Sequence, residues 1–194
     1  MASTRIEQGI SRVPEDVFIE NGMEVVAGGL TVTAGGLTVT AGTTTLGASF
    51  VRDLVTLTAT DAITVAEHAG RILLMGEVGG DAAATFTLPA ATGSGAEFQF
   101  IVSVVNTSNY IIAVADATDT IDGSVILHQD SANTVVSFNT ASDSDTITLN
   151  GTTKGGVSIG DEITLIDIAT NQYMVKGVLT ASGTEATPFS AAVS

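Results

Sequence analysis

The chain contains no cysteine and no tryptophan, and both absences exclude classes of protein. Without cysteine there is no disulfide scaffold, no cysteine-rich zinc site and no thiol nucleophile. Aromatic residues make up only 5% of the 194 residues, so extended platforms for stacking bases or sugars are not expected. A chain of this length hides about 70% of the surface of its unfolded form, so it builds a core without metal or disulfide staples.

Positive charge is also scarce, since six Lys and Arg residues oppose 21 Asp and Glu residues and leave a net charge of −15. Nucleic-acid affinity depends on cations that neutralise phosphates, so DNA and RNA are not expected partners. Long apolar runs are missing too: the stretch at 98–105 is broken by Gln99 and Ser103, far short of the about 20 residues of a membrane span. The N-terminus lacks the apolar core of a signal peptide, so we expect synthesis in a cytoplasm.

What the sequence does contain is an internal repeat. Residues 21–48 divide into four sevens, NGMEVVA, GGLTVTA, GGLTVTA and GTTTLGA. A period of seven is also typical of coiled coils, but here the apolar residues lie two apart and a glycine pair opens each middle unit. Glycine pairs and β-branched residues are unfavourable in a helix, whereas Leu-Thr-Val-Thr alternates as a strand does. The repeat therefore predicts short strands that turn or bulge at each glycine pair.

We expect this repeat to form the stalk of an intertwined homotrimer. A module with two medium-sized apolar side chains per unit cannot cover its own apolar face, and isolated short strands are marginal in water. Winding around two other copies would pair the strand edges and bury the apolar residues along a shared axis. The predicted trimer-interface residues are Leu30, Val32, Leu37, Val39 and Leu46. The alternative is a regular β-meander at the edge of the main domain.

Residues 1–20 differ in character and form an N-terminal arm. Apolar residues are scattered among charges, Pro14 divides the stretch, and no single periodicity fits. Such an arm is either frayed or ordered only against a partner. The apolar residues that would anchor it to a partner are Ile6, Ile10, Val13, Val17 and Phe18.

Residues 49–194 are expected to form one all-β domain, an antiparallel sandwich or barrel. Short β-type segments alternate with turn signals, and no helical pattern of 10–15 residues interrupts them, as βαβ units would require. The expected strands are 54–58, 63–65, 71–75, 84–88, 98–105, 110–114, 125–127, 134–138, 146–149, 162–168 and 172–178. A helical turn is expected only near residues 61–67. Asn150-Gly151 predicts a type I′ hairpin, and Pro89 should end the strand before it.

Candidate catalytic groups are few. The two histidines, His68 and His128, have neither the spacing of a metal pair nor that of a known nucleophile arrangement, so surface or loop positions are expected. No GxSxG elbow is present, and Gly93-Ser94-Gly95 lacks the lysine of a phosphate-binding loop. We therefore expect neither an enzyme nor a cofactor.

Three aspartates, Asp116, Asp119 and Asp122, lie close together in the segment DATDTIDG. Carboxylates grouped in this way can collect a hard cation such as Ca²⁺. The spacing differs from that of an EF-hand, and aspartate is common in turns because it hydrogen-bonds the local backbone. Plain turns are the favoured interpretation, and calcium binding is the alternative.

The glycine-opened repeats followed by a β-domain resemble tailed-bacteriophage virion proteins of the head-decoration or fibre type. The segments TLPAATGSGAEFQFIV, DGSVIL, DTITLNGTTKGG and GTEATPF also resemble a domain found at the ends of structural proteins in marine phages. The resemblance covers residues 21–190. It implies a trimer with a role in assembly, on the capsid at three-fold or quasi-three-fold positions or in a spike or fibre, and it does not identify the surface of attachment.

On this resemblance we expect a non-enzymatic capsid decoration or cement protein, a homotrimer bound to the major capsid protein on the outer surface of the virion. Residues 1–20 would anchor it, 21–48 would knit the trimer, and the β-domain would project or clamp neighbouring capsid proteins. The strong negative charge suits the outside of a particle because it disfavours contact with packaged DNA. The alternative is a head or tail fibre whose C-terminal domain recognises a host-surface glycan, and the poor potential for stacking sugars makes decoration the preferred interpretation.

Overall fold

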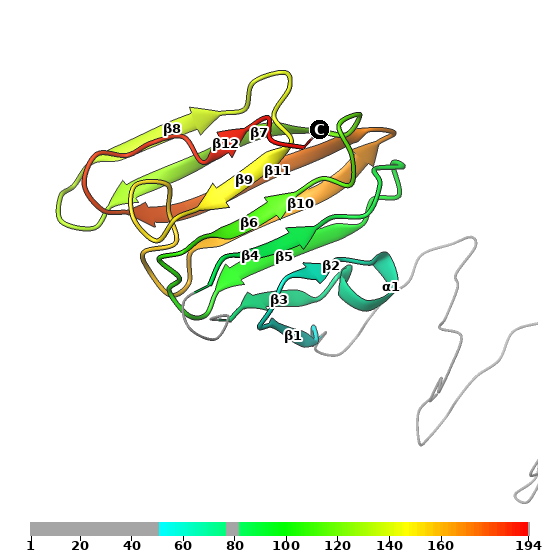
Figure 1. Ribbon diagram of the computed structural model, residues 1–194, viewed down its shortest axis with the longest axis horizontal. Coiled ribbons are helices and arrows are strands. Elements are labelled where there is room, and N and C mark those ends of the chain that lie inside the picture. Colours follow the sequence, from blue (N-terminus) through cyan, green and yellow to red (C-terminus); the bar gives the residue numbers. More distant parts are fainter. Residues whose placement is uncertain (1–50, 77–81, 194) are drawn as a thin grey trace, which may run out of the picture. The chain divides into compact units, whose positions relative to one another are not determined.

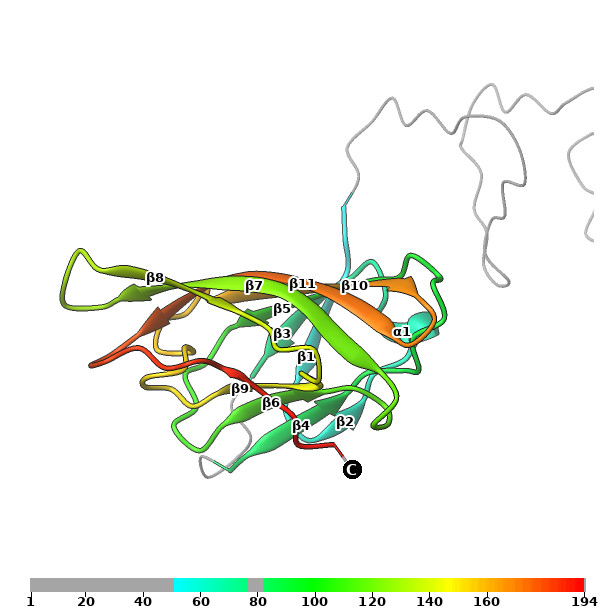
Figure 2. The same ribbon diagram turned by 90° about the horizontal axis from the view of Figure 1, so that it is seen from above.

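In the computed structural model, residues 51–76 and 82–193 are described. They form two stacked β-sheets within a unit that spans Phe50–Ser194 (Figures 1 and 2). From edge to edge, the seven-stranded sheet contains β1 (Leu54–Leu57), β3 (Ile72–Met75), β5 (Glu97–Val102), β10 (Glu162–Ala169), β11 (Gln172–Ala181), β7 (Thr120–Gln129) and β8 (Val135–Asn139). The five-stranded sheet contains β12 (Phe189–Ser190), β9 (Thr146–Leu149), β6 (Tyr110–Ala113), β4 (Ala84–Thr87) and β2 (Asp61–Ala62). With 49% strand and 3% helix, the expected all-β character is confirmed.

Both sheets are mixed, so the expectation of a purely antiparallel domain is wrong. The pairs β1–β3, β3–β5, β7–β11, β2–β4 and β4–β6 are parallel. For all of these pairs except β7–β11, the cause is the path of the chain, which changes sheet at every step from β1 to β6. A strand that returns to its own sheet by way of the other layer runs in the same direction as before, whereas a hairpin reverses it.

The core lies between the sheets and contains most of the few aromatic side chains. Phe86 on β4 stacks against Phe100 on β5 across the two layers, with ring centroids 6.0 Å apart, and against Tyr110 on β6 at 6.1 Å. Both tyrosines, Tyr110 and Tyr173, are fully buried, and each hydroxyl donates to a backbone carbonyl. Large rings at the centre therefore join the layers, and no aromatic side chain is needed on the outside.

The expected strands largely coincide with the observed ones, and two local predictions are confirmed. The helical turn is α1 (Val65–His68), which begins where the Thr64 hydroxyl accepts from the Glu67 N–H at 3.2 Å. The strand before Pro89 ends at Thr87. The two-residue strands β2 and β12 were not expected, because segments that short carry no detectable alternation. The strand expected at 63–65 does not form, since α1 begins at Val65.

The hairpin predicted at Asn150-Gly151 does not form. Gly151 has a positive φ of 63°, but Asn150 does not, and the next strand begins only at Glu162. The Asn150 side chain instead accepts from the N–H groups of Thr152 and Lys154 and organises a longer loop. Strand β9 pairs with β6 and β12.

No helix within the described ranges has the length and apolar character needed to cross a bilayer.

Candidate interaction surface

The two outward faces of the sandwich differ in chemistry. On the five-stranded sheet, the partly exposed positions between buried core residues include Thr85, Thr87 and Thr148. Strand residues alternate between the two faces of a sheet, so these hydroxyls face solvent. Apart from Ile111, which lies between Thr85 and Thr148, these positions have the polar character that a solvated sheet surface normally has.

The outward face of the seven-stranded sheet, here called the aliphatic face, carries a group of exposed and half-buried aliphatic side chains among polar ones. Its outward positions follow from the same alternation, because the intervening residues are buried in the core. The apolar members are Leu54 on β1, Ile72 and Leu74 on β3, Ile101 on β5, Ile166 on β10, Met174 and Val178 on β11, Ile126 on β7 and Val135 on β8. Leu54, Val178 and Ile126 are 64%, 49% and 40% exposed.

The apolar residues are contiguous because the strand registers align them. Leu74 is paired with Ile101, Ile101 with Glu162, Glu162 with Val178, and Val178 with Ile126. This row crosses five neighbouring strands and is interrupted only by Glu162. An aliphatic row of this length is a candidate contact surface for another protein.

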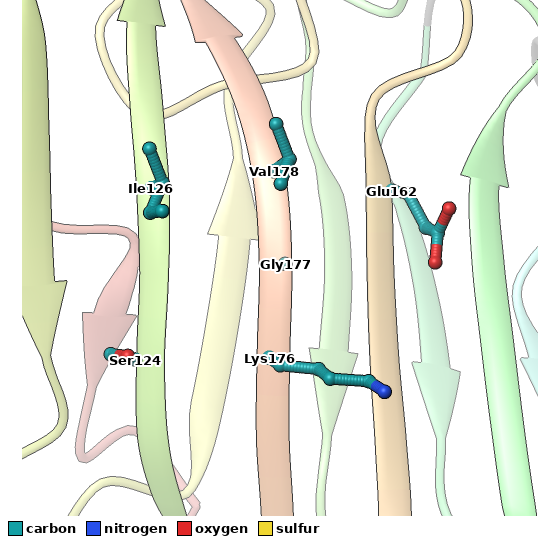
Figure 3. Close-up of a pocket in the computed structure, with 6 residues that line it drawn as sticks. All are labelled: Ser124, Ile126, Glu162, Lys176, Gly177 and Val178. Carbon is teal, nitrogen blue, oxygen red and sulfur yellow. The ribbon is translucent and has the colours of Figure 1, made fainter.

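A shallow depression of about 310 Å³ lies in the middle of this face (Figure 3). It is lined by Ser124, Ile126, Glu162, Lys176, Gly177 and Val178. In Figure 3, Ile126 and Val178 lie beside each other, the Lys176 side chain extends over β10, and the Glu162 carboxylate points away from it.

The charges on this face are nearly balanced, in contrast to the chain as a whole. Arg52 donates to Gln99 and lies 3.7 Å from the carboxylate of Glu97. Lys176 forms no ion pair or hydrogen bond with any described residue, and the Glu162 carboxylate accepts only from the Thr164 hydroxyl, at 3.2 Å. Among the described residues, the cations Arg52 and Lys176 therefore lie on this face beside the acids Glu97, Glu162 and Asp122.

The most highly hydrogen-bonded carboxylate is Asp167, at the irregular end of β10. Its two oxygens accept from the backbone N–H groups of Thr92, Gly93 and Ser94 and from the Thr92 and Ser94 hydroxyls, at 2.7 to 3.2 Å. Burial by itself would raise the pKa of Asp167, but the hydrogen bonds, that from the Ser94 hydroxyl foremost, outweigh it and lower the pKa to about 2. Asp167 thus holds the loop after Pro89 against the sheet and is ionised at neutral pH.

Other buried aspartates also join loops to strands. Asp161 accepts from the N–H groups of Gly156 and Thr180 at 2.8 and 2.9 Å, and Asp145 accepts from the N–H groups of Ala192 and Val193. Burial raises the pKa of Asp161, because two backbone hydrogen bonds only partly replace its lost hydration. The backbone partners account for the burial of these acids as structural groups.

The two histidines have different surroundings. His128 is exposed on β7, as expected. His68 is only 4% exposed, so the expectation of a surface position is wrong for it. Its Nδ1 accepts from the Thr64 N–H at 3.0 Å, and its Nε2 lies 3.9 Å from Asp61. The buried His68 side chain therefore hydrogen-bonds the backbone at the start of α1. The spacing of histidines in the sequence could not indicate this contact.

The three aspartates considered for calcium do not converge. Asp116 accepts from the Thr118 hydroxyl and N–H, which lowers its pKa. Asp119 accepts from the Ala91 N–H at 3.2 Å, and burial raises its pKa. Asp122 accepts from the Gln172 side chain at 2.7 Å. In residues 51–76 and 82–193, no three His, Cys, Asp or Glu side chains gather closely enough to hold a metal ion.

The other predicted site residues lie outside the described residues. These are the trimer-interface residues Leu30, Val32, Leu37, Val39 and Leu46, and the anchoring residues Ile6, Ile10, Val13, Val17 and Phe18.

Comparison with known proteins gives the surface no precedent. No protein-family model matches the chain, and no curated protein matches it. The role of the surface must be inferred from its residues.

The aliphatic face was missed at the level of sequence, although a signal for it exists. Strand β3 is the uninterrupted apolar run Ile72–Met75, and β5 ends in another, Phe100-Ile101-Val102. Runs without polar alternation are typical of strands that are covered on both faces, as parallel strands usually are. These two runs therefore indicate apolar residues on both faces of β3 and of the end of β5.

Proposed function

We propose that the protein is a non-enzymatic structural protein of a bacteriophage virion, a decoration or cement protein that acts as a homotrimer on the outer capsid surface. The observation that carries the proposal is the aliphatic outward face of the seven-stranded sheet. Exposed aliphatic rows of this kind serve contacts between proteins and not the binding of small polar substrates.

The buried carboxylates support a structural role. Asp167, Asp161 and Asp145 each bind loop or terminal backbone, so their charges are committed to holding the sandwich together. A domain whose loops are tied down in this way is a rigid spacer or clamp. The net charge of −15 keeps its surface away from packaged DNA.

The three regions of the chain divide the task. Residues 1–20 anchor the protein to the major capsid protein, 21–48 hold the trimer, and the β-sandwich reinforces the outer surface. The competing fibre hypothesis requires a glycan site, and sugar sites are normally lined by aromatic side chains. Tyr110 and Tyr173 are both buried in the core and cannot stack on a sugar, so the decoration hypothesis is favoured.

The test uses the purified full chain, expanded empty heads of the phage that encodes it, and its host cells. We expect a light-scattering mass of three chains, co-sedimentation with the heads and no coating of the cells. A variant lacking residues 2–18 should remain a folded trimer and should lose head binding.

Each part of the proposal has its own contrary result. A mass near one chain contradicts the homotrimer. Head binding retained by the deletion variant contradicts the role of the arm, and binding to cells in place of heads contradicts decoration and supports the fibre alternative.

A further inference from the structure

Within the described residues, one face of the seven-stranded sheet is covered by the other sheet, although the runs in β3 and at the end of β5 are apolar on both faces. Ile72 and Leu74 on β3 point outward between the buried Leu73 and Met75, and β1, β3 and β5 are parallel neighbours. Parallel strands with apolar residues on both sides normally carry a second layer. Within the described ranges, the view from above shows one other sheet, on the inner side (Figure 2).

We propose that this second layer is the same face of other copies of the chain, so that the outward faces of the seven-stranded sheets pack together in the assembly. The number of copies is taken from the homotrimer of the proposed function. The assignment of this face as the contact surface does not depend on that number and is argued from the residues of the face.

The first argument is electrostatic. Copies that each carry −15 repel one another, so they approach best through their least acidic surface. The aliphatic face carries Arg52 and Lys176 against Glu97, Glu162 and Asp122, which is close to balance. Facing copies therefore meet little net repulsion here, and each copy adds apolar area.

The second argument concerns the two charges at the centre of the face. Lys176 has no partner among the described residues, and the Glu162 carboxylate turns away from it (Figure 3). Lys176 is paired with Thr164 across the β10–β11 ladder, so Glu162 lies one row away. An identical face brings a carboxylate to each ammonium and an ammonium to each carboxylate. Around a three-fold axis, each copy would offer Lys176 to one neighbour and Glu162 to the other, in addition to its apolar residues.

The size of the face sets the strength of the contact. Seven strands at about 4.8 Å spacing and about six residues at about 3.3 Å each give a footprint of about 600 Å² per copy. Stable interfaces bury about 800 Å² per partner. The face alone thus supports weak association, and the trimerising repeat proposed for residues 21–48 would raise the local concentration of the faces.

Other occupants fit the face less well. Its strand positions present no aromatic side chain for stacking on a sugar. One unpaired ammonium, that of Lys176, is too little positive charge for a nucleic acid. Capsid protein remains a competing occupant that the experiment separates.

The absence of cysteine permits a direct test, because a single introduced cysteine carries a label at one position only. Ser124→Cys places a nitroxide in the depression on the aliphatic face, and Thr148→Cys places the matched control on the threonine-rich face. The full chain is used, and pulsed electron–electron double resonance measures the distances between labels on different chains.

We expect the labels at position 124 to lie closer together than those at 148 by at least about 15 Å, since the sheets are about 10 Å apart within each copy. Loss of assembly on labelling position 124 but not 148 would also support the proposal. An assembled trimer whose labels are farther apart at 124 than at 148 overturns it and leaves the homotrimer standing. A single-chain mass overturns both.

A charge-reversal set adds an independent measurement. Lys176→Glu and Glu162→Lys should each weaken self-association at least about tenfold by sedimentation, and the double variant should restore it. Equal self-association by the parent protein, the two single variants and the double variant would contradict the pairing of Lys176 with Glu162 between copies. If the thiol introduced by Ser124→Cys reacts freely with maleimide in the trimer and is protected only on heads, the face belongs to capsid protein and the proposal is overturned.

Discussion

At the scale of single residues, the unusual feature is a set of buried aspartates with backbone partners. Asp167 lies where the pairing of β10 with β11 becomes irregular, and there it accepts from five donors of one loop. Because the hydrogen bonds hold its pKa at about 2, its ionised form stabilises the fold. The pKa shifts of Asp119 and Asp161 have the opposite sign, because burial raises the pKa of each carboxyl group.

Replacing the Asp167 carboxylate tests this assignment. Asp167→Asn leaves one acceptor oxygen where two were used, and its amide donors face other donors. We expect a loss of about 2 to 3 kcal/mol in the free energy of unfolding at pH 7, measured by denaturant titration. The same change at the exposed Asp143 should cost less than about 0.5 kcal/mol.

The pH dependence of that loss gives a second readout. The folded pKa of Asp167 is below the ordinary value of 3.8, so its contribution is fully present above about pH 4 and is lost as the pH falls through about 2. The difference in stability between the parent protein and Asp167→Asn should therefore narrow between pH 4 and pH 2. A difference that stays constant over this range would contradict the assigned role.

At the scale of elements, the close parallel pair β7–β11 depends on a glycine. Gly123 on β7 has a φ of 143°, and a Cβ there would lie 2.1 Å from the Val175 carbonyl oxygen of β11. The contact is with backbone, so no side-chain rotation relieves it. A larger residue would have to separate two central strands of the sheet that forms the aliphatic face.

We expect Gly123→Ala to cost at least about 3 kcal/mol in the free energy of unfolding. Gly70→Ala is the matched control, because Gly70 has a φ of 72° but no atom within 4 Å of a built Cβ. It should lose only about 1 kcal/mol, the cost of a left-handed alanine. Thermal unfolding of both variants measures the difference, and equal losses would show that backbone conformation alone is responsible.

At the scale of the whole molecule, net negative charge and the aliphatic face have opposite effects on association between copies. Net repulsion between chains of −15 acts over the whole surface, whereas apolar contact is confined to the outward side of the seven-stranded sheet. The threonine-rich opposite face offers no such contact. The molecule is therefore expected to associate in one orientation.

Salt should strengthen that association. Raising the ionic strength from about 0.02 M to about 0.5 M shortens the screening length from about 20 Å to about 4 Å, which removes most of the repulsion between copies. The dissociation constant of the full-chain assembly, measured by sedimentation, should fall about tenfold. An increase with salt would mean that the screened Lys176–Glu162 pairs between copies outweigh the screened net repulsion.

The sequence by itself determined the class of the domain and most of its strands. Two kinds of signal are local: alternation in segments such as Thr85-Phe86-Thr87-Leu88, and residues that end a strand, such as Pro89. Local signals depend only on neighbouring residues, so they can be recognised before the fold is known. The Thr64 cap of α1 is of the same kind.

Only the tertiary structure decided which strands are neighbours and which residues meet. Strands joined by a hairpin and strands joined through the other sheet show the same hydrophobic alternation. The sequence therefore could not distinguish parallel from antiparallel pairs. The row Leu74, Ile101, Glu162, Val178 and Ile126 unites four distant segments through strand register, and the five donors of Asp167 lie more than 70 residues before it in the chain. Contacts of that range depend on how the sheets stack, which no local pattern records.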